Sequence, residues 1–350
     1  MRPCVPRPAP RTSVLEQTPG QVAGVGEVFA RRYELLDPIA DGGMGSVWLV
    51  RDLTEGDVKV AKLLRQSDAG SLLRFMREQS TRIHHPHVVT PLSWVGEDDS
   101  VLFTMPLVRG GSVATLVGDW GALPEQWTVE IVAQALTALD AVHAARVVHR
   151  DVKPANLLLE PTGPGRPHVR LSDFGIAAPL DQPRMTVAAT ALGTPGYVAP
   201  EQRSGGDPDP RQDLYSVGIV GLEMLLGHPP PFTLDELPPT PLGQFLARAS
   251  DPDPERRPDS AATMRADLRA RWPESAWQEG EIEVLDQFAG HGAAPRGVEH
   301  RPAPPTTVLA GDPPPAAPRS RSQPSAAAIV ALGVAGVLLV VLAVVLLVVG

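Results

Sequence analysis

The chain has very little cysteine and no excess of positive charge. Its 350 residues include one cysteine, Cys4, so an intrachain disulfide framework is excluded, which favours a cytosolic location for the folded part. Lysine and arginine number 31 against 40 aspartates and glutamates, and the resulting formal net charge of −9 provides no electrostatic footprint for nucleic acid. Residues 1–28 lack the apolar core of a secretory signal and predict a disordered lead.

Charged and polar side chains are also absent from residues 326–349. At about 1.5 Å per residue this segment reaches roughly 36 Å, which is enough to cross a hydrocarbon core of about 30 Å. The pattern predicts one transmembrane helix, and the alternative is a buried core helix. Residues 273–325, rich in proline towards their end, predict a juxtamembrane linker between this helix and the folded part.

The flanks of the apolar segment predict its orientation. Arg319 and Arg321 precede it and no charge follows it, so the positive-inside rule predicts a single-pass protein of the cell membrane, with its folded part in the cytoplasm and its C-terminus outside. Ala327, Ala331 and Ala335 recur at four-residue spacing, which suggests a homodimer formed by close helix approach.

The most informative stretch is His-Arg-Asp-Val-Lys-Pro-Ala-Asn, residues 149–156, followed downstream by Asp173-Phe174-Gly175. Transfer of a phosphoryl group depends mainly on positioned charge. In this spacing Asp151 is the candidate acceptor of a hydroxyl proton, and Lys153 the candidate that neutralises charge on the moving group. Asn156 and Asp173 offer oxygen ligands to Mg²⁺. The alternative is a polar turn after an apolar strand.

This run and several others resemble the eukaryotic-type serine/threonine protein kinases, in particular the bacterial membrane-bound ones, over residues 33–272. The resemblance implies an α+β, bilobal kinase fold over 29–272. A small antiparallel sheet with one helix would occupy 29–106 and a mainly helical lobe 107–272. It also implies ATP and Mg²⁺ as cofactors, and proteins bearing serine or threonine as substrates.

A glycine-rich loop is expected where the chain first matches the family, because glycine lets the backbone approach phosphates closely. The family pattern G-x-G-x-x-G-x-V has alanine here at its first glycine, a departure expected to affect nucleotide entry. The expected ATP-contacting residues of this loop are Ile39, Ala40, Asp41, Gly42, Gly43, Met44, Gly45, Ser46 and Val47.

A lysine on the following strand should contact the phosphates. Lys59 and Lys62 both lie in the apolar run 58–64, and they should face opposite sides of a strand because the side-chain period is two. Lys62 is favoured by its distance from Gly45. The resemblance implies Glu78 as its carboxylate partner, whereas the bland alternative is a solvated helix glutamate paired with a neighbouring arginine.

The hinge between the lobes is expected at Met105-Pro106-Leu107-Val108, with Met105 as gatekeeper. Pro106 has no N–H to donate, so the resemblance implies the Val108 amide as the donor to adenine.

Residues 185–201 resemble an activation segment that closes with Ala-Pro-Glu. Thr186 and Thr190 are candidate phosphorylation sites, since phosphothreonine could pair with Arg150, and the alternative is that both are simply solvated. Thr194 and Lys153 imply serine or threonine as the acceptor.

Two further resemblances imply structural roles. Asp213 would brace the catalytic loop, and Arg257 would pair with Glu201.

The sequence therefore predicts an active protein kinase that phosphorylates its own activation loop. Two alternatives remain: a nucleotide-binding pseudokinase that acts as a scaffold, and a phosphotransferase for small molecules. The peptide-binding pattern around Thr194 disfavours the second.

Overall fold

The computed structural model describes residues 24–42, 45–65, 83–173, 178–179 and 194–289. Within these ranges no helix is both long and apolar enough to cross a membrane. The predicted span 326–349 lies outside them, as do residues 290–325 of the predicted linker and most of the predicted lead.

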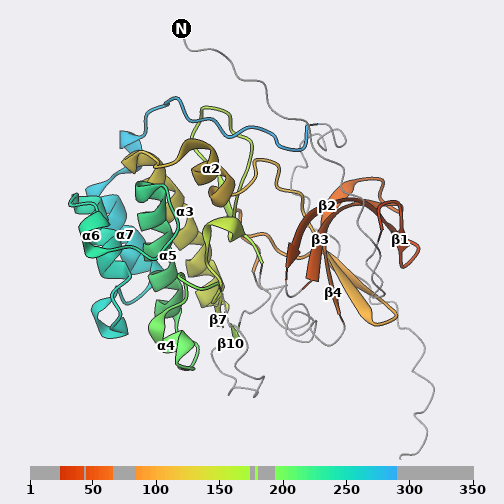
Figure 1. Ribbon diagram of the computed structural model, residues 1–350, viewed down its shortest axis with the longest axis horizontal. Coiled ribbons are helices and arrows are strands. Elements are labelled where there is room, and N and C mark those ends of the chain that lie inside the picture. The colour runs from red at the N-terminus through yellow and green to blue at the C-terminus, as the bar shows by residue number, and fades with distance from the viewer. Residues whose placement is uncertain (1–23, 43–44, 66–82, 174–177, 180–193, 290–350) are drawn as a thin grey trace, which may run out of the picture. The chain divides into compact units, whose positions relative to one another are not determined.

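The N-terminal part of the described chain forms a six-stranded antiparallel sheet in the order β1-β2-β3-β4-β6-β5, coloured red to orange in Figure 1. Its strands are β1 (Val28–Phe29), β2 (Tyr33–Gly42), β3 (Gly45–Asp52), β4 (Val58–Arg65), β5 (Ser93–Glu97) and β6 (Ser100–Met105). Short turns join most of its neighbours, so strands that follow one another in sequence pair in space.

The two faces of this sheet contribute to different apolar clusters. On β6, Leu102 packs in a small cluster with Tyr33 and Trp48, whereas Val101 and Phe103 belong to the main core. Successive side chains of a strand point to opposite faces, and this alternation explains why neighbouring residues of β6 belong to different clusters.

The C-terminal part is mainly helical, with two short strand pairs, β7 with β10 and β8 with β9, among its helices (Figure 1). Its helices are α2 (Val113–Trp120), α3 (Glu125–Ala144), α4 (Pro200–Arg203), α5 (Pro210–Leu226), α6 (Pro241–Ala249) and α7 (Ala261–Arg271). Its short strands are β7 (Val147–Val148), β8 (Leu157–Leu159), β9 (Val169–Leu171) and β10 (Ala178–Pro179), and its 3-10 turns are η2 (Pro154–Asn156), η3 (Leu234–Glu236), η4 (Pro254–Arg256) and η5 (Glu274–Ala276).

Helix α3 lies at the centre of the helical lobe. Trp127, Ile131, Leu136 and Leu139 are fully buried along it, and it contacts α5, α7 and β9. A helix buried around most of its circumference is held by packing rather than by its own propensity. Helix α3 is followed directly by β7 and the loop after it, so its packing fixes where that loop begins. The predicted α+β fold, a small antiparallel sheet followed by a helical lobe, is thus confirmed, while the helix expected around Glu78 lies outside the described residues.

The packed chain continues past Trp272, where the sequence analysis ends the domain. Ile282 and Val284 are buried in the main core, and Trp277 packs edge-on against Trp127 with ring centroids 5.3 Å apart. The two aliphatic residues alternate with exposed glutamates over too few positions to give a recognisable strand pattern. Residues 273–289 therefore belong structurally to the helical lobe rather than to a linker.

Candidate active site

The loop after β7 is anchored by one buried carboxylate. Asp213, at the start of α5 and fully buried, accepts hydrogen bonds from the backbone amides of His149 (2.9 Å) and Arg150 (2.7 Å) and from Nε2 of His143 (2.7 Å). Burial by itself raises the pKa of Asp213, but the His143 hydrogen bond and nearby positive charge lower it overall. The predicted bracing contact is present.

Two non-glycine residues of this region have left-handed backbone conformations, Arg150 with φ 67° and Asp173 with φ 65°. Such conformations cost free energy and persist only where surrounding contacts fix them. At Arg150 those contacts are visible, because its amide donates to Asp213 and its carbonyl accepts from Nε2 of Gln202 (3.0 Å). The strained residue comes immediately before Asp151 and so sets its direction.

The two oxygens of Asp151 have different surroundings. Oδ2 accepts from Nζ of Lys153 (2.9 Å) and from Nδ2 of Asn156 (3.0 Å). Oδ1 lies 3.5 Å from the hydroxyl of Thr194, which also accepts from Lys153 at 2.8 Å. Because Oδ2 is held twice, the carboxylate is fixed in orientation with Oδ1 directed towards the Thr194 segment.

Asn156 and Asp173 are brought together by the pairing of β8 with β9. Leu157 pairs with Leu171, and one step beyond this pair the carbonyl of Asn156 accepts from the amide of Ser172 (2.9 Å). The two predicted metal ligands are therefore neighbours by register. The amide nitrogen of Asn156 also donates to the Asp151 carbonyl (2.8 Å), which turns its oxygen away from Asp151. An amide oxygen and a carboxylate are the hard ligands that Mg²⁺ prefers, so this pair fits the metal.

The lysine that faces this site is Lys62. Its side chain points to the same face of β4 as that of Leu64, which belongs to the main core. Its Nζ lies 2.6 Å from Oδ1 of Asp173. Lys59 has the opposite parity, as predicted. This ion pair joins the sheet to the helical lobe at the point where the phosphates and the metal are expected.

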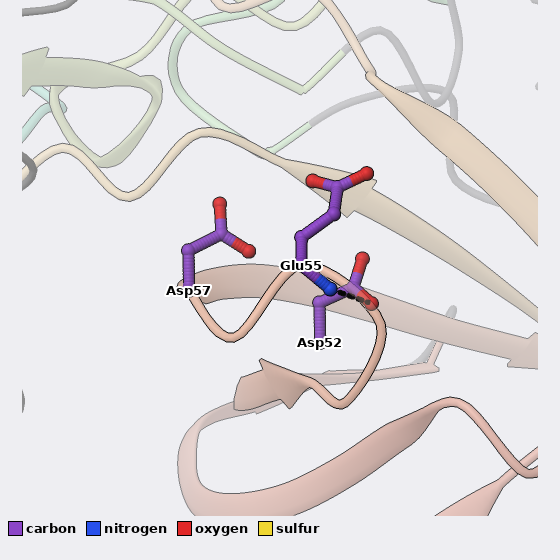
Figure 2. Close-up of side chains that lie close together, drawn as sticks. All are labelled: Asp52, Glu55 and Asp57. Carbon is purple, nitrogen blue, oxygen red and sulfur yellow. Dashed lines mark hydrogen bonds between the residues drawn. The ribbon is translucent and has the colours of Figure 1, made fainter.

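Lys59 belongs to a separate network on the other side of the sheet. Asp52, Glu55 and Asp57 bring carboxylate oxygens within 4.8 Å of one another, as Figure 2 shows. Lys59 contacts all three, and Arg32 adds three hydrogen bonds to the buried Asp52. The two cations offset most of the charge of the three carboxylates, so the cluster is an ion-pair network.

The glycine-rich loop is described on both sides of its tip. The pairs Ala40 with Val47, Asp41 with Ser46 and Gly42 with Gly45 continue β2 into β3. Gly45 has φ +134°, and a Cβ there would lie 2.2 Å from the carbonyl oxygen of Leu63, so only glycine fits. Ala40, which replaces the first glycine of the family pattern, pairs with Val47 in the sheet, and Ile39 is exposed.

Several predicted site residues lie outside the described residues: Gly43 and Met44 at the loop tip, Glu78, and the candidate phosphorylation sites Thr186 and Thr190. The hinge is described. Met105 ends β6 opposite Val60, and the side chain of Val108, three residues on, is buried.

The segment after the activation loop is fixed to the helical lobe by Arg257. Its guanidinium contacts both carboxylate oxygens of Glu201, at 2.7 and 2.9 Å. Burial raises the pKa of Glu201 and the Arg257 hydrogen bonds lower it, with a net lowering. The predicted pairing is present.

Sequence reasoning missed three contacts that hold the site. These are the His143 bond to Asp213, the Gln202 bond to the Arg150 carbonyl, and the Asn156 bonds to Asp151. Asn156 was expected only as a metal ligand. Its position in the motif was the one available signal, whereas the partners of the other two contacts lie 70 and 52 positions apart in the sequence.

Comparisons with known proteins agree with this geometry. A family model described as the protein kinase domain matches residues 33–238. Serine/threonine-protein kinase pkn3 of Myxococcus xanthus is 34% identical over 287 residues, covering 73% of this chain and 52% of the relative. PknB of Mycobacterium leprae is 35% identical over 268 residues, covering 68% and 42%. PkaB of Streptomyces coelicolor is 39% identical over 208 residues, covering 57% and 49%.

The family model spans more than half of the chain, so the chain belongs to the protein kinase family. The chain spans about half the length of the curated relatives it matches.

Proposed function

We propose that the protein is a serine/threonine protein kinase that uses ATP and Mg²⁺ to phosphorylate proteins, including its own activation loop at Thr186 or Thr190. The observation that carries this proposal is the fixed carboxylate of Asp151, held through Oδ2 by Lys153 and Asn156 with Oδ1 turned towards Thr194. A carboxylate presented in this way suits a general base for a hydroxyl group.

Each residue of the site has a distinct task in this mechanism. Oδ1 of Asp151 accepts the proton of the substrate hydroxyl as that oxygen attacks. Lys153, which contacts both Asp151 and Thr194, places a positive charge between the base and the acceptor segment. Asn156 and Asp173 would hold Mg²⁺, and Lys62 would contact the nucleotide phosphates. When bound, ATP would supply the γ-phosphoryl group with ADP as the leaving group, and Mg²⁺ would supply part of the positive charge that stabilises the transfer.

The choice of serine or threonine over small molecules rests on the acceptor segment. Thr194 lies within hydrogen-bond reach of Lys153, and the Glu201–Arg257 pair fixes the helix that ends this segment. Residues 194–201 form a surface next to the proposed base, Asp151, on which an extended peptide could bind. The relatives named serine/threonine-protein kinase support the same acceptor class.

The test compares the wild-type chain with Asp151→Asn, which keeps an acceptor for Lys153 but removes the base. Both are purified in detergent, incubated with MgATP and a generic basic protein, and mapped by mass spectrometry. We expect phosphate on the substrate and on Thr186 or Thr190 with the wild type alone. Activity of the variant above about one per cent of wild type would contradict the role of Asp151. ATP binding without transfer by the wild type would favour the pseudokinase alternative.

We further propose that residues 326–349 anchor the kinase in the cell membrane, with the catalytic part in the cytoplasm. The proposal is supported by the uncharged segment and by Arg319 and Arg321 before it. Protease treatment of intact cells and of inverted vesicles tests the orientation, because only the vesicles should lose the kinase domain. Recovery of the full chain in the soluble fraction would refute anchoring.

We also propose a homodimer formed through the small residues of this segment. Replacing Ala331 by leucine tests it, because the dimer should dissociate if small residues form the contact.

A further inference from the structure

The described chain ends in a short segment, Ile282–Phe288, that we name the C-terminal strap. After η5 the strap runs back towards the start of α2, as the blue trace in Figure 1 shows. Ile282 and Val284 insert into the main core, while Glu283 between them is exposed. The strap is thus packed against the helical lobe through these two aliphatic side chains.

Backbone hydrogen bonds fix the strap at one position along its length. The amide of Gly163 donates to the carbonyl of Val284 (2.9 Å), and the amide of Val284 donates to the carbonyl of Gly163 (2.8 Å). A reciprocal pair of this kind sets the register, so the residues that follow Val284 reach a defined place.

That place is the end of the hinge. The amide of Gln287 donates to the carbonyl of Arg109 (2.8 Å), Nε of Arg109 donates to Oδ2 of Asp286 (2.8 Å), and a terminal nitrogen of Arg109 donates to the carbonyl of Phe288 (2.6 Å). Arg109 comes directly after Val108, the residue expected to contact adenine. Its side chain is only 12% exposed, whereas that of Asp286 is 33% exposed, so Arg109 is the more enclosed partner of this pair.

The backbone after the hinge is enclosed from both sides. Gly110 donates to the carbonyl of Leu159 (2.7 Å) in β8, and a Cβ on Gly110 would lie 2.5 Å from that oxygen and 2.6 Å from Cγ1 of Val284. At Gly111, whose φ is +79°, a Cβ would lie 2.5 Å from Nε2 of Gln287. Residues 110–111 are therefore held between β8, which continues from Asn156, and the strap.

We propose that the C-terminal strap is a positioning element of the nucleotide site, with Asp286 and Val284 as its positioning residues. By holding Arg109 and Gly110 against β8, the strap fixes the position of the Val108 backbone relative to Asn156 and Asp173, at the two ends of the proposed nucleotide site. This inference rests on the proposed function, because the ligand it positions is ATP. Loss of the strap weakens ATP binding and leaves the transfer step intact, since Asn156 and Thr194, which hold Asp151 and Lys153, lie outside the strap.

The test uses the full-length chain and the variants Asp286→Ala and Val284→Ala, with Glu283→Ala as a matched control. Glu283 lies in the same strap, is exposed like Asp286 and carries the same charge, but its removal leaves Arg109 paired with Asp286. ATP binding is measured by equilibrium titration, which needs no turnover. KM for ATP and kcat are measured separately, and thermal unfolding is recorded for every variant.

We expect Asp286→Ala to raise the dissociation constant and the KM for ATP about tenfold, equivalent to about 1.4 kcal/mol, with kcat changed less than twofold. Asp286→Glu should restore most of the affinity, and Glu283→Ala should match the wild type. Unchanged ATP affinity in Asp286→Ala would overturn the proposal, even if the midpoint of unfolding fell, because the strap would then only stabilise the fold. This variant decides the matter if Val284→Ala fails to fold.

The titration also separates this inference from the proposed function. A wild-type chain that binds ATP without transferring phosphate would contradict the proposed kinase activity, and the variants would still test the strap. A wild-type chain that binds no ATP overturns both.

Discussion

Replacement of Arg257 by lysine should destabilise the protein far more than its conservative chemistry suggests. The side chain is fully buried and uses all five of its N–H donors. Nε donates to the Asp251 carbonyl (2.7 Å), one terminal nitrogen to Glu201 (2.7 Å) and the Arg211 carbonyl (3.0 Å), and the other to Glu201 (2.9 Å) and the Pro252 carbonyl (3.1 Å).

The magnitude follows from counting donors. A lysine ammonium has three N–H groups, so at least two of the five acceptors lose their partner. Each lost hydrogen bond to a charged group costs about 1.5 kcal/mol, which gives a loss of about 3 kcal/mol. For a domain of this size such a loss corresponds to a fall in the unfolding midpoint of roughly 6 to 12 °C.

The assay is thermal unfolding of the full-length chain, followed by circular dichroism. Arg256→Lys is the matched control, because Arg256 is 72% exposed and makes one long ion pair of 3.5 Å, so it should change stability by less than about 0.5 kcal/mol. The Michaelis constant for a peptide should rise in Arg257→Lys, since Glu201 fixes the end of the acceptor segment. A midpoint within 1 or 2 °C of the wild type, or an equal fall in both variants, would refute the donor count.

Three further predictions concern other parts of the molecule. Lys62→Met should lower phosphate transfer by about 10² or more, while Lys59→Met should leave transfer intact and lower stability by about 1–3 kcal/mol; kinetics and urea unfolding of both distinguish the two roles. Asp213→Asn should lower both stability, by about 2–3 kcal/mol, and kcat, because an amide cannot accept all three buried hydrogen bonds; wild-type kcat at reduced stability would contradict the bracing role. Burial raises the pKa of Glu223 despite its hydrogen bond from Tyr197, so the folded state favours the protonated carboxyl and loses stability as pH rises through the raised pKa. Glu223→Gln should therefore match the wild type below pH 4.5 and become the more stable form as the pH rises above it, as measured by urea unfolding at a series of pH values.

The site could be predicted from sequence wherever a short motif or a strand parity fixed it. Asp151, Asn156 and Asp173 lie in short runs whose residue types match one chemistry, and the odd separation of Lys59 from Lys62 sets them on opposite faces of β4. The prediction that Lys62 faces the site required only residues close to it in the sequence, the farthest being Gly45.

Contacts between distant segments were not predictable in the same way. Arg109 and Asp286 are separated by 177 positions, and neither residue type is unusual at a protein surface. Ile282 and Val284 give two apolar positions among charged neighbours, which is too short a pattern to distinguish a packed strap from a linker. The domain boundary at residue 272 was therefore placed too early, because the sequence before Gly290 lacks the periodicity that would have extended it.

The reciprocal bonds between Gly163 and Val284 bear on how the gene can vary. The loop from residue 160 to 168 joins β8 to β9 and, as a surface connection, would ordinarily tolerate insertions and deletions. Here a residue added on either side of Gly163 would move its amide and carbonyl away from the strap, and with them the segment that contacts Arg109. We expect related kinases that keep an aliphatic pair at positions 282 and 284 to keep the length of this loop, and those that lack the pair to vary it freely.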